Sequence, residues 1–210
     1  MDGETFLETL REAKATELDR LGSDKVLLAT TGGSLDETAV RAALASADAT
    51  VREVYREWST DEPDVDAGAA FVAAADQAAD HAQRIAEPLD DEPAIDVDDP
   101  VAEYLRSQDA TVDRLAAGLV ARPLVRDRTL LQAVNFFVNE ADRTGADLAR
   151  DLRTDVEITR EDGLDLLVDR CDDAADEERA REAAAGLVDA AYRGYVDALD
   201  ELGLDPRPIC

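Results

Sequence analysis

The chain has 210 residues, with 50 Asp and Glu against 22 Lys and Arg and a formal net charge of −28. Such a surface disfavours nucleic acid and anionic membranes as partners, because both are bound through concentrated Lys and Arg. Molar salt shortens the Debye length to about 3 Å and relieves the self-repulsion of so many carboxylates. The charge therefore indicates adaptation to a salt-rich cytoplasm, while a hydrophobic content of 45% is that of an ordinary globular protein.

The N-terminal residues lack a cationic stretch followed by a long apolar run, and no apolar run long enough for a spanning helix follows later. We therefore expect neither a signal peptide nor a membrane span, and a cytoplasmic location. Cys171 and Cys210 lack the spacing of a metal-binding pair, and a disulfide between them is not expected in a reducing cytosol. The aspartates after Cys171 predict a raised thiol pKa. Cys210 is expected on an exposed, proline-stiffened tail, where it could form a mixed or intersubunit disulfide.

Hydrophobic residues recur with a helical period along the whole chain, which predicts an all-α protein. Leucines predict a first amphipathic helix over residues 4–21, and a short apolar segment then ends at the hinge glycines Gly32 and Gly33. Ser34 and Glu37 match the capping box, in which each side chain satisfies a free amide at the start of a helix.

From Ser34 we expect a long bundle helix to residue 61. Its partner is expected over 65–87, with Val72 and Ala75 on its buried stripe. The short connection around Pro63 forces these two helices into an antiparallel hairpin.

Residues 88–100 contain three prolines, and six of these thirteen residues are acidic, which predicts a linker. Its aspartates do not match an EF-hand calcium loop, because Val101 stands at the position that requires glycine. Asp99 followed by Pro100 is a typical helix start. The remaining helices are predicted over 101–121, from Pro123 to about 140, over 144–171 and over 174–202.

The hairpin also carries a resemblance to a known family. A helix ending in Tyr55-Arg56-Glu57-Trp58, a tight turn and an Ala-rich helix with Ala78-Ala79-Asp80-His81 resemble haloarchaeal proteins of the rubrerythrin family, in the ferritin-like superfamily. Arg170-Cys171-Asp172-Asp173 and the Pro-x-Pro ending extend the resemblance over most of the chain. It implies a ferritin-like four-helix bundle over 34–203, with an N-terminal helical arm over 1–33 and a C-terminal tail over 204–210.

Catalytic members of that superfamily hold two irons with a Glu from each of two helices and an E-x-x-H motif from each of the other two. Antiparallel geometry places Asp48 opposite position 78, one turn from His81. The required Glu is Ala78, and His81 is the only histidine, so the full ligand set cannot be assembled. One hypothesis is a single iron or manganese site at Asp48 and His81, helped by Asp80 or Gln77. The favoured interpretation is that His81 is a hydrogen-bonded structural residue.

Arg122, Arg126 and Arg128 form the only local cluster of positive charge. They could hold a phosphate or an acidic partner, although pairing with nearby carboxylates is the favoured interpretation. Phe136 and Phe137 are expected in the core, with a dimer contact as the alternative.

The sequence leaves three hypotheses about function. The first is a non-catalytic ferritin-like protein that lacks the di-iron centre and serves as an interaction or oligomerisation module, with a protein partner or a second copy of itself. The second is an atypical metal-dependent redox or peroxide-handling protein that uses Asp48, His81 and a thiol. The third, transcription antitermination, is a description that such haloarchaeal proteins receive, but no basic surface or RNA-binding module supports it.

Overall fold

The computed structural model describes residues 2–206, and within that range all regular structure is helical, which confirms the all-α class. The helices are α1 (Gly3–Ala13), α2 (Ala15–Leu21), α3 (Lys25–Thr30), α4 (Glu37–Asp61), α5 (Val65–Ala86), α6 (Pro100–Arg106), α7 (Thr111–Arg114), the π-helix η1 (Leu115–Ala121), α8 (Arg122–Asn139), α9 (Arg143–Arg170) and α10 (Ala174–Glu201). The sequence thus predicts α5, α9 and α10 to within one residue at each end.

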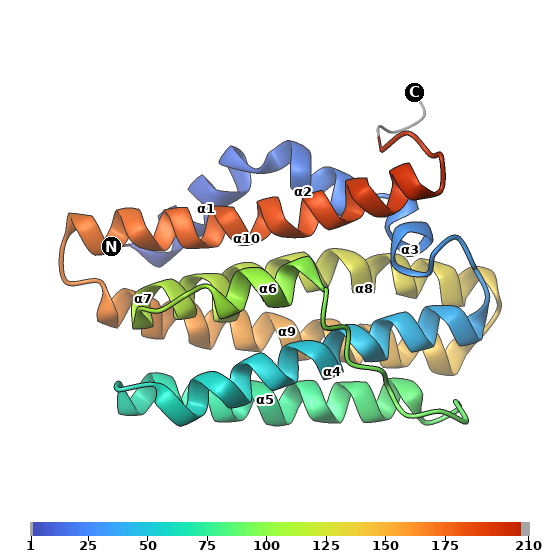
Figure 1. The fold of residues 1–210 in the computed structure, drawn as a ribbon, viewed down its shortest axis with the longest axis horizontal. Helices are drawn as coiled ribbons and strands as arrows, with labels where there is room; N and C mark the ends of the chain where they lie inside the picture. Colours follow the sequence, from blue (N-terminus) through green and yellow to red (C-terminus); the bar gives the residue numbers. More distant parts are fainter. Residues whose placement is uncertain (1, 207–210) are drawn as a thin grey trace.

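Two antiparallel hairpins form the lower half of the molecule in Figure 1. The first joins α4 to α5, as predicted from the short turn at Pro63, and the second joins α8 to α9. Residues 87–99, which were predicted as a linker, run from the end of the first hairpin to α6. The side chain of Asp99 accepts a hydrogen bond from the amide of Ala102 (2.6 Å), which confirms the predicted start of α6.

Helix α10 packs on α6, η1 and α8, and α1 and α2 lie on the other side of α10 (Figure 1). Helix α3 lies on the same side of α10 as α8 and contacts α10, α8 and α4. Lys14 Nζ lies 2.6 Å from Asp189 Oδ1 of α10, and Gln132 Nε2 donates to the carbonyl of Gly22 (2.6 Å). These contacts hold the N-terminal segment against its own chain. The segment is two helices rather than one over 4–21, since α1 ends at Ala13 and the backbone leaves the helical conformation at Lys14.

Aspartate caps the start of the long helices. Asp36, Asp64, Asp142 and Asp173 each accept a hydrogen bond from a backbone amide in the first turn that follows. A carboxylate there satisfies a free donor and lies favourably in the helix dipole. The predicted capping box was therefore wrong, because α4 begins after Asp36 and not at Ser34.

The break between the predicted helices at Pro123 was also wrong. The chain is interrupted at residues 107–110 instead, and α7, η1 and α8 then form one continuous helix that passes through Pro123. Pro123 lies directly after the π-helix, where the backbone departs from the regular i→i−4 hydrogen-bonding pattern that a proline would interrupt inside an α-helix.

The predicted buried stripe of α5 is confirmed at Ala75, which is 3% exposed, and wrong at Val72. Phe71 is fully buried against Trp58, with ring centroids 5.1 Å apart, whereas Val72 is 48% exposed. Alanines give little contrast between the faces of a helix, so the periodicity of this segment was ambiguous. The correct stripe brings Ala78 and His81 into the interior.

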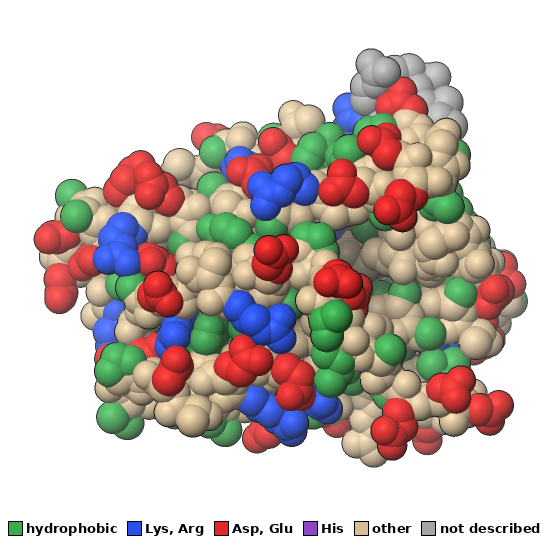
Figure 2. All heavy atoms as spheres, viewed as in Figure 1, with side chains coloured by type: hydrophobic (Ala, Val, Ile, Leu, Met, Phe, Trp, Pro, Cys, Tyr) green, Lys and Arg blue, Asp and Glu red, His purple; other side chains and the backbone are tan. Residues whose placement is uncertain are grey.

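Acidic side chains are spread over the face drawn in Figure 2 and outnumber the basic ones, as the composition requires. Within residues 2–206, none of the helices combines the length and the apolar composition needed to cross a membrane.

The close approach of α9 to η1 depends on Gly163, and this can be tested with two Gly→Ala substitutions. A Cβ at Gly163 would lie 2.5 Å from Leu119 Cβ and 2.7 Å from its carbonyl oxygen. Because the backbone of η1 cannot move aside, we expect Gly163→Ala to lower the free energy of unfolding by about 1–3 kcal/mol in urea titrations at high salt.

Gly68→Ala is the matched control, since the nearest atom to its added Cβ is 3.8 Å away. We expect this variant to gain about 0.5–1 kcal/mol through lower entropy of the unfolded chain. Equal effects of the two substitutions would show that the α9–η1 contact is not tight.

Candidate functional site

A buried cluster of charges joins the two hairpins. Asp48, on α4, has no exposed surface, and its two carboxylate oxygens accept hydrogen bonds from two arginines of α8. Arg122 Nη2 donates to Oδ1 (2.6 Å), and Arg126 Nη2 donates to Oδ2 (2.5 Å) and to the carbonyl of Leu44 (3.0 Å). Four residues separate the arginines on one helix, so both project from the same face toward α4.

The arginines decide the charge state of Asp48. Burial alone would raise its pKa, but Arg126 and Arg122 outweigh that effect and hold the pKa below its ordinary value. Tyr55, one more buried neighbour, has its pKa raised to about 12, chiefly by burial, and donates its hydroxyl to the carbonyl of Gly118 in η1 (2.7 Å). One carboxylate thus faces two guanidinium groups in the interior, beside a neutral phenol.

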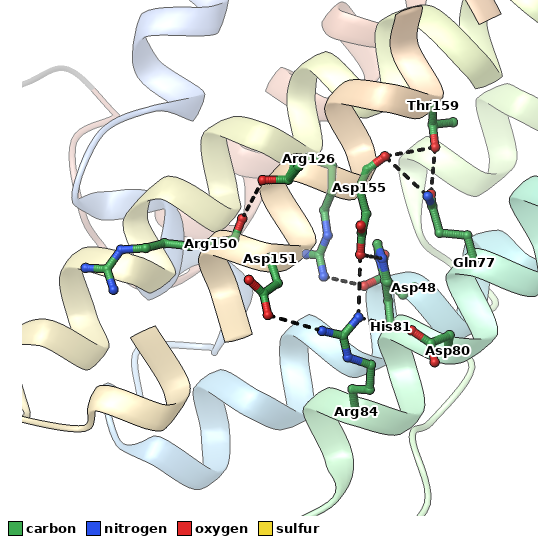
Figure 3. A network of polar contacts seen from close by, with 11 residues as sticks. Asp48, Gln77, Asp80, His81, Arg84, Arg126, Arg150, Asp151, Asp155 and Thr159 are labelled. Atoms are coloured by element: carbon green, nitrogen blue, oxygen red, sulfur yellow. Dashed lines mark hydrogen bonds and ion pairs between the residues drawn. The ribbon is translucent and has the colours of Figure 1, made fainter. Parts of the chain in front are cut away.

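His81 lies on α5, across from Asp48 of α4, and makes a hydrogen bond to the second hairpin (Figure 3). Its Nε2 is 3.2 Å from Asp155 Oδ2 of α9. The same oxygen is 3.5 Å from Arg84 Nη1, while Gln77 Nε2 donates to the carbonyl of Asp155 (3.2 Å). Because a carboxylate only accepts, the geometry assigns the proton of a neutral imidazole to Nε2.

The imidazole of His81 is only 1% exposed, and burial lowers its pKa below the ordinary value of about 6.5. The charge of Asp48 opposes this effect, Arg126 adds to it, and Asp155 opposes it more weakly. His81 is therefore neutral at pH 7. Its role as a hydrogen-bonded residue between α5 and α9 matches the favoured interpretation of the sequence.

The structure brings Asp48 and His81 together, as the hairpin geometry predicts, but their surroundings do not fit a di-iron pair. Both oxygens of Asp48 are engaged by guanidinium groups, and a metal cation there would meet two positive charges. Ala78 supplies no ligand. Within residues 2–206, no three His, Cys, Asp or Glu side chains lie together as a ligand set for a metal ion.

A cavity of about 330 Å³ lies against this charge cluster. Its walls come from α3, α4, α6, α8 and α10, and both Arg122 and Arg126 line it. Figure 2 shows the opening as a recess to the right of α6. The volume falls at the lower end of the range for small-molecule sites, roughly 300–1,000 Å³.

The linker forms one side of the opening. The amide of Asp96 donates to the Thr50 hydroxyl on α4 (2.9 Å), which holds the linker against the first hairpin. Asp99 also lines the cavity, and its pKa is raised by burial while its side chain caps α6. The acidic residues lie where the linker enters α6, and the arginines lie on α8.

Other sequence predictions have mixed outcomes. Arg122 and Arg126 pair with a carboxylate as predicted, but with Asp48, which is more than 70 residues away in sequence. The prediction was wrong for Arg128, which makes no ion pair within residues 2–206 and whose Nε is buried without a partner. Burial, reinforced by Asp176 and Glu177, raises the thiol pKa of Cys171, as expected.

Phe137 is 3% exposed and belongs to the core, in agreement with the favoured interpretation of the Phe136-Phe137 pair. Cys210 and the end of the predicted tail lie outside the described residues.

Sequence reasoning missed Asp155 as the partner of His81, as well as the cavity itself. Asp155 gives no signal of its own among 50 acidic residues. The spacing of Arg122 and Arg126 was the available signal, because two arginines four positions apart lie on one helix face and can reach the same acidic partner.

Removing the charge of Asp48 tests whether the cluster stabilises the fold. We expect Asp48→Asn to lower the free energy of unfolding by about 3 kcal/mol at pH 7, because two buried guanidinium groups lose the one carboxylate within residues 2–206 that forms an ion pair with them. Asp80→Asn is the control, since Asp80 pairs with Arg84 at an exposed site, and we expect a change below about 0.5 kcal/mol. Urea unfolding in molar KCl measures both, and a loss of similar size in each variant would rule out a special role for Asp48.

The single histidine makes its effect on stability measurable. The pKa of His81 is lower in the folded chain than in the unfolded chain, so below about pH 6.5 the unfolded chain binds the proton more readily. The stability that the neutral imidazole contributes is therefore complete above about pH 6.5 and is lost as the pH falls through the folded-state pKa. Between pH 7.5 and pH 5.5, we expect wild type to lose more stability than His81→Gln, by at most about 1.4 kcal/mol per pH unit. Urea titrations at both pH values measure this, and identical losses would contradict the assignment.

Comparisons of the chain with protein-family models, with curated proteins and with solved structures give no match. What the chain does has therefore to follow from the geometry of the Asp48 cluster and its cavity.

Proposed function

We propose that the protein is a non-catalytic, ferritin-like helical bundle that binds a small organic molecule in the cavity against the Asp48–Arg122–Arg126 cluster. The observation that carries the proposal is that two buried arginines both pair with Asp48 and both line the cavity, which Asp48 itself does not line. Concave sites with apolar walls and a few fixed polar groups are typical of small-molecule binding.

Two antiparallel hairpins joined by a long linker support the ferritin-like assignment, since that topology has one long crossover. In this arrangement Asp48 and His81 occupy two of the positions from which a bundle directs metal ligands inward. The residues that face them from the second hairpin are Arg122, Arg126 and Asp155.

The arginines supply the positive charge that a cation supplies in a metal-binding bundle. Guanidinium groups are always protonated in proteins and hold a carboxylate by charge-assisted hydrogen bonds. A redox protein that uses iron or manganese needs a free carboxylate at Asp48, and this one has two bonded partners. This contact favours the non-catalytic role over the metal-dependent alternative.

Substitution of two alanines on α4 tests the cavity. Ala47 lines it and is half-buried, so Ala47→Leu places three extra carbon atoms in the cavity, whereas Ala42 is exposed and does not line it. Saturation-transfer NMR with a mixture of 1-hexanol, hexanoate and hexylamine then measures binding. We expect at least one of these probes to bind wild type and Ala42→Leu, and to lose most of its signal with Ala47→Leu.

Both substitutions exchange one strong helix former for another, so a difference between them reports the cavity and not the stability of α4. If none of the probes binds wild type, or if Ala47→Leu binds as well as Ala42→Leu, the proposed function is wrong.

A further inference from the structure

The guanidinium groups of Arg122 and Arg126 are only partly used by the protein. Each carries five N–H donors. Arg122 donates through Nη2 to Asp48, and Arg126 donates through Nη2 to Asp48 and to Leu44. Arg126 Nε is buried without a partner, although the side chain is 5% exposed and lines the cavity. Such a donor is costly to leave unsatisfied, so the cluster is incomplete as a set of hydrogen bonds.

The cluster is also incomplete in charge. Asp48 neutralises one of the two guanidinium groups, and His81 and Tyr55 are neutral beside it. Asp96 and Asp99 also line the cavity, and the charge of Asp99 acts on Arg122 from a distance. Asp99 makes no ion pair with either arginine within 4.0 Å, and its side chain caps α6. One buried positive charge is left without a contacting anion, and in a low dielectric this favours binding of an anion.

The rest of the cavity restricts the anion to an organic one. Away from the arginines its walls are mainly aliphatic, from Val26 of α3, Leu44 and Val51 of α4, and Val125 of α8. Small alanines of α10, including Ala190 and Ala191, form the opposite wall and leave space for an apolar group. Burial of such a group contributes about 25 cal/mol for each Å² removed from water.

We infer that the cavity binds a small monocarboxylate, whose carboxyl group accepts hydrogen bonds from Arg122 and Arg126 while its apolar body lies among the aliphatic side chains of α3, α4 and α10. The inference rests on the proposed function and adds the chemical class of the ligand. The two carboxyl oxygens match the fork of a guanidinium group, and the ligand would stand on the opposite side of the arginines from Asp48.

Isothermal titration calorimetry of the wild-type protein in molar KCl, with hexanoate and hexanamide as probes, tests the ligand class without any mutation. The two probes have nearly the same shape, and only hexanoate is charged at pH 7. Exposed ion pairs are screened at this salt concentration, whereas buried ones are screened much less. We expect hexanoate to bind at least about tenfold more tightly than hexanamide.

The variant Asp48→Asn gives a second, independent measurement. Without its internal anion the arginine pair has a greater need of an external one, so we expect hexanoate to bind this variant more tightly than wild type and to raise its Tm by more. Hexanamide should show no such gain. If Asp48→Asn does not fold alone, recovery of a cooperative transition on addition of hexanoate is the expected result, and no recovery counts against the inference.

The outcomes separate the ligand class from the function. Binding of hexanamide, 1-hexanol or hexylamine equal to that of hexanoate, but sensitive to Ala47→Leu, would keep the cavity as a binding site and overturn the monocarboxylate. Inorganic phosphate binding as tightly as hexanoate would show that the aliphatic walls do not select the ligand, which also overturns it. Binding of none of these probes would overturn both proposals together.

Discussion

The hydrogen bonds from Arg122 and Arg126 to Asp48 are the interaction on which the rest of the structure depends. They join the first hairpin to the second in the interior, where each partner would be costly to bury alone. Because the arginines keep Asp48 charged, the interior here is polar, and the same two arginines line the cavity. The aliphatic cavity, the linker at its opening and the neutral His81 across from it are all arranged around this buried charge cluster.

The π-helix η1 connects this cluster to the packing of the bundle. A π-turn adds a residue to the helical repeat and so changes the direction in which later side chains project. In this chain η1 lies directly before Arg122, and its Gly118 lets the backbone approach the ring of Trp58. The same segment bonds to Tyr55 and contacts α9 at Gly163. Small residues along η1 thus determine where the arginines of α8 meet α4, and π-turns of this kind occur often at functional sites.

The acidic composition has two different consequences in the fold. On the surface it keeps carboxylates in excess, and at the helix starts it supplies Asp caps such as Asp36 and Asp142. These caps are local interactions, so the sequence alone predicts the cap of α6 at Asp99. It predicts the wrong cap for α4, because Ser34 also matches a capping sequence and lies two residues before the actual cap, Asp36. In the interior, arginines outnumber carboxylates at the Asp48 cluster, where one carboxylate pairs with two arginines. Positive charge is thus in excess at this point of the interior, although the whole chain carries a net charge of −28.

By itself the sequence determined the all-α class, most helix boundaries, the linker and the scarcity of metal ligands, because these depend on local periodicity, on caps and on composition. It also placed Asp48 near His81, since a short turn leaves a hairpin only one arrangement. Only the tertiary structure decided that Arg122 and Arg126 meet Asp48, 74 and 78 residues away, and that Asp155 meets His81. Such pairs depend on the packing of two hairpins and on the change that η1 makes in the direction of the side chains that follow it. Among 50 carboxylates, no local sequence pattern marks which one is buried.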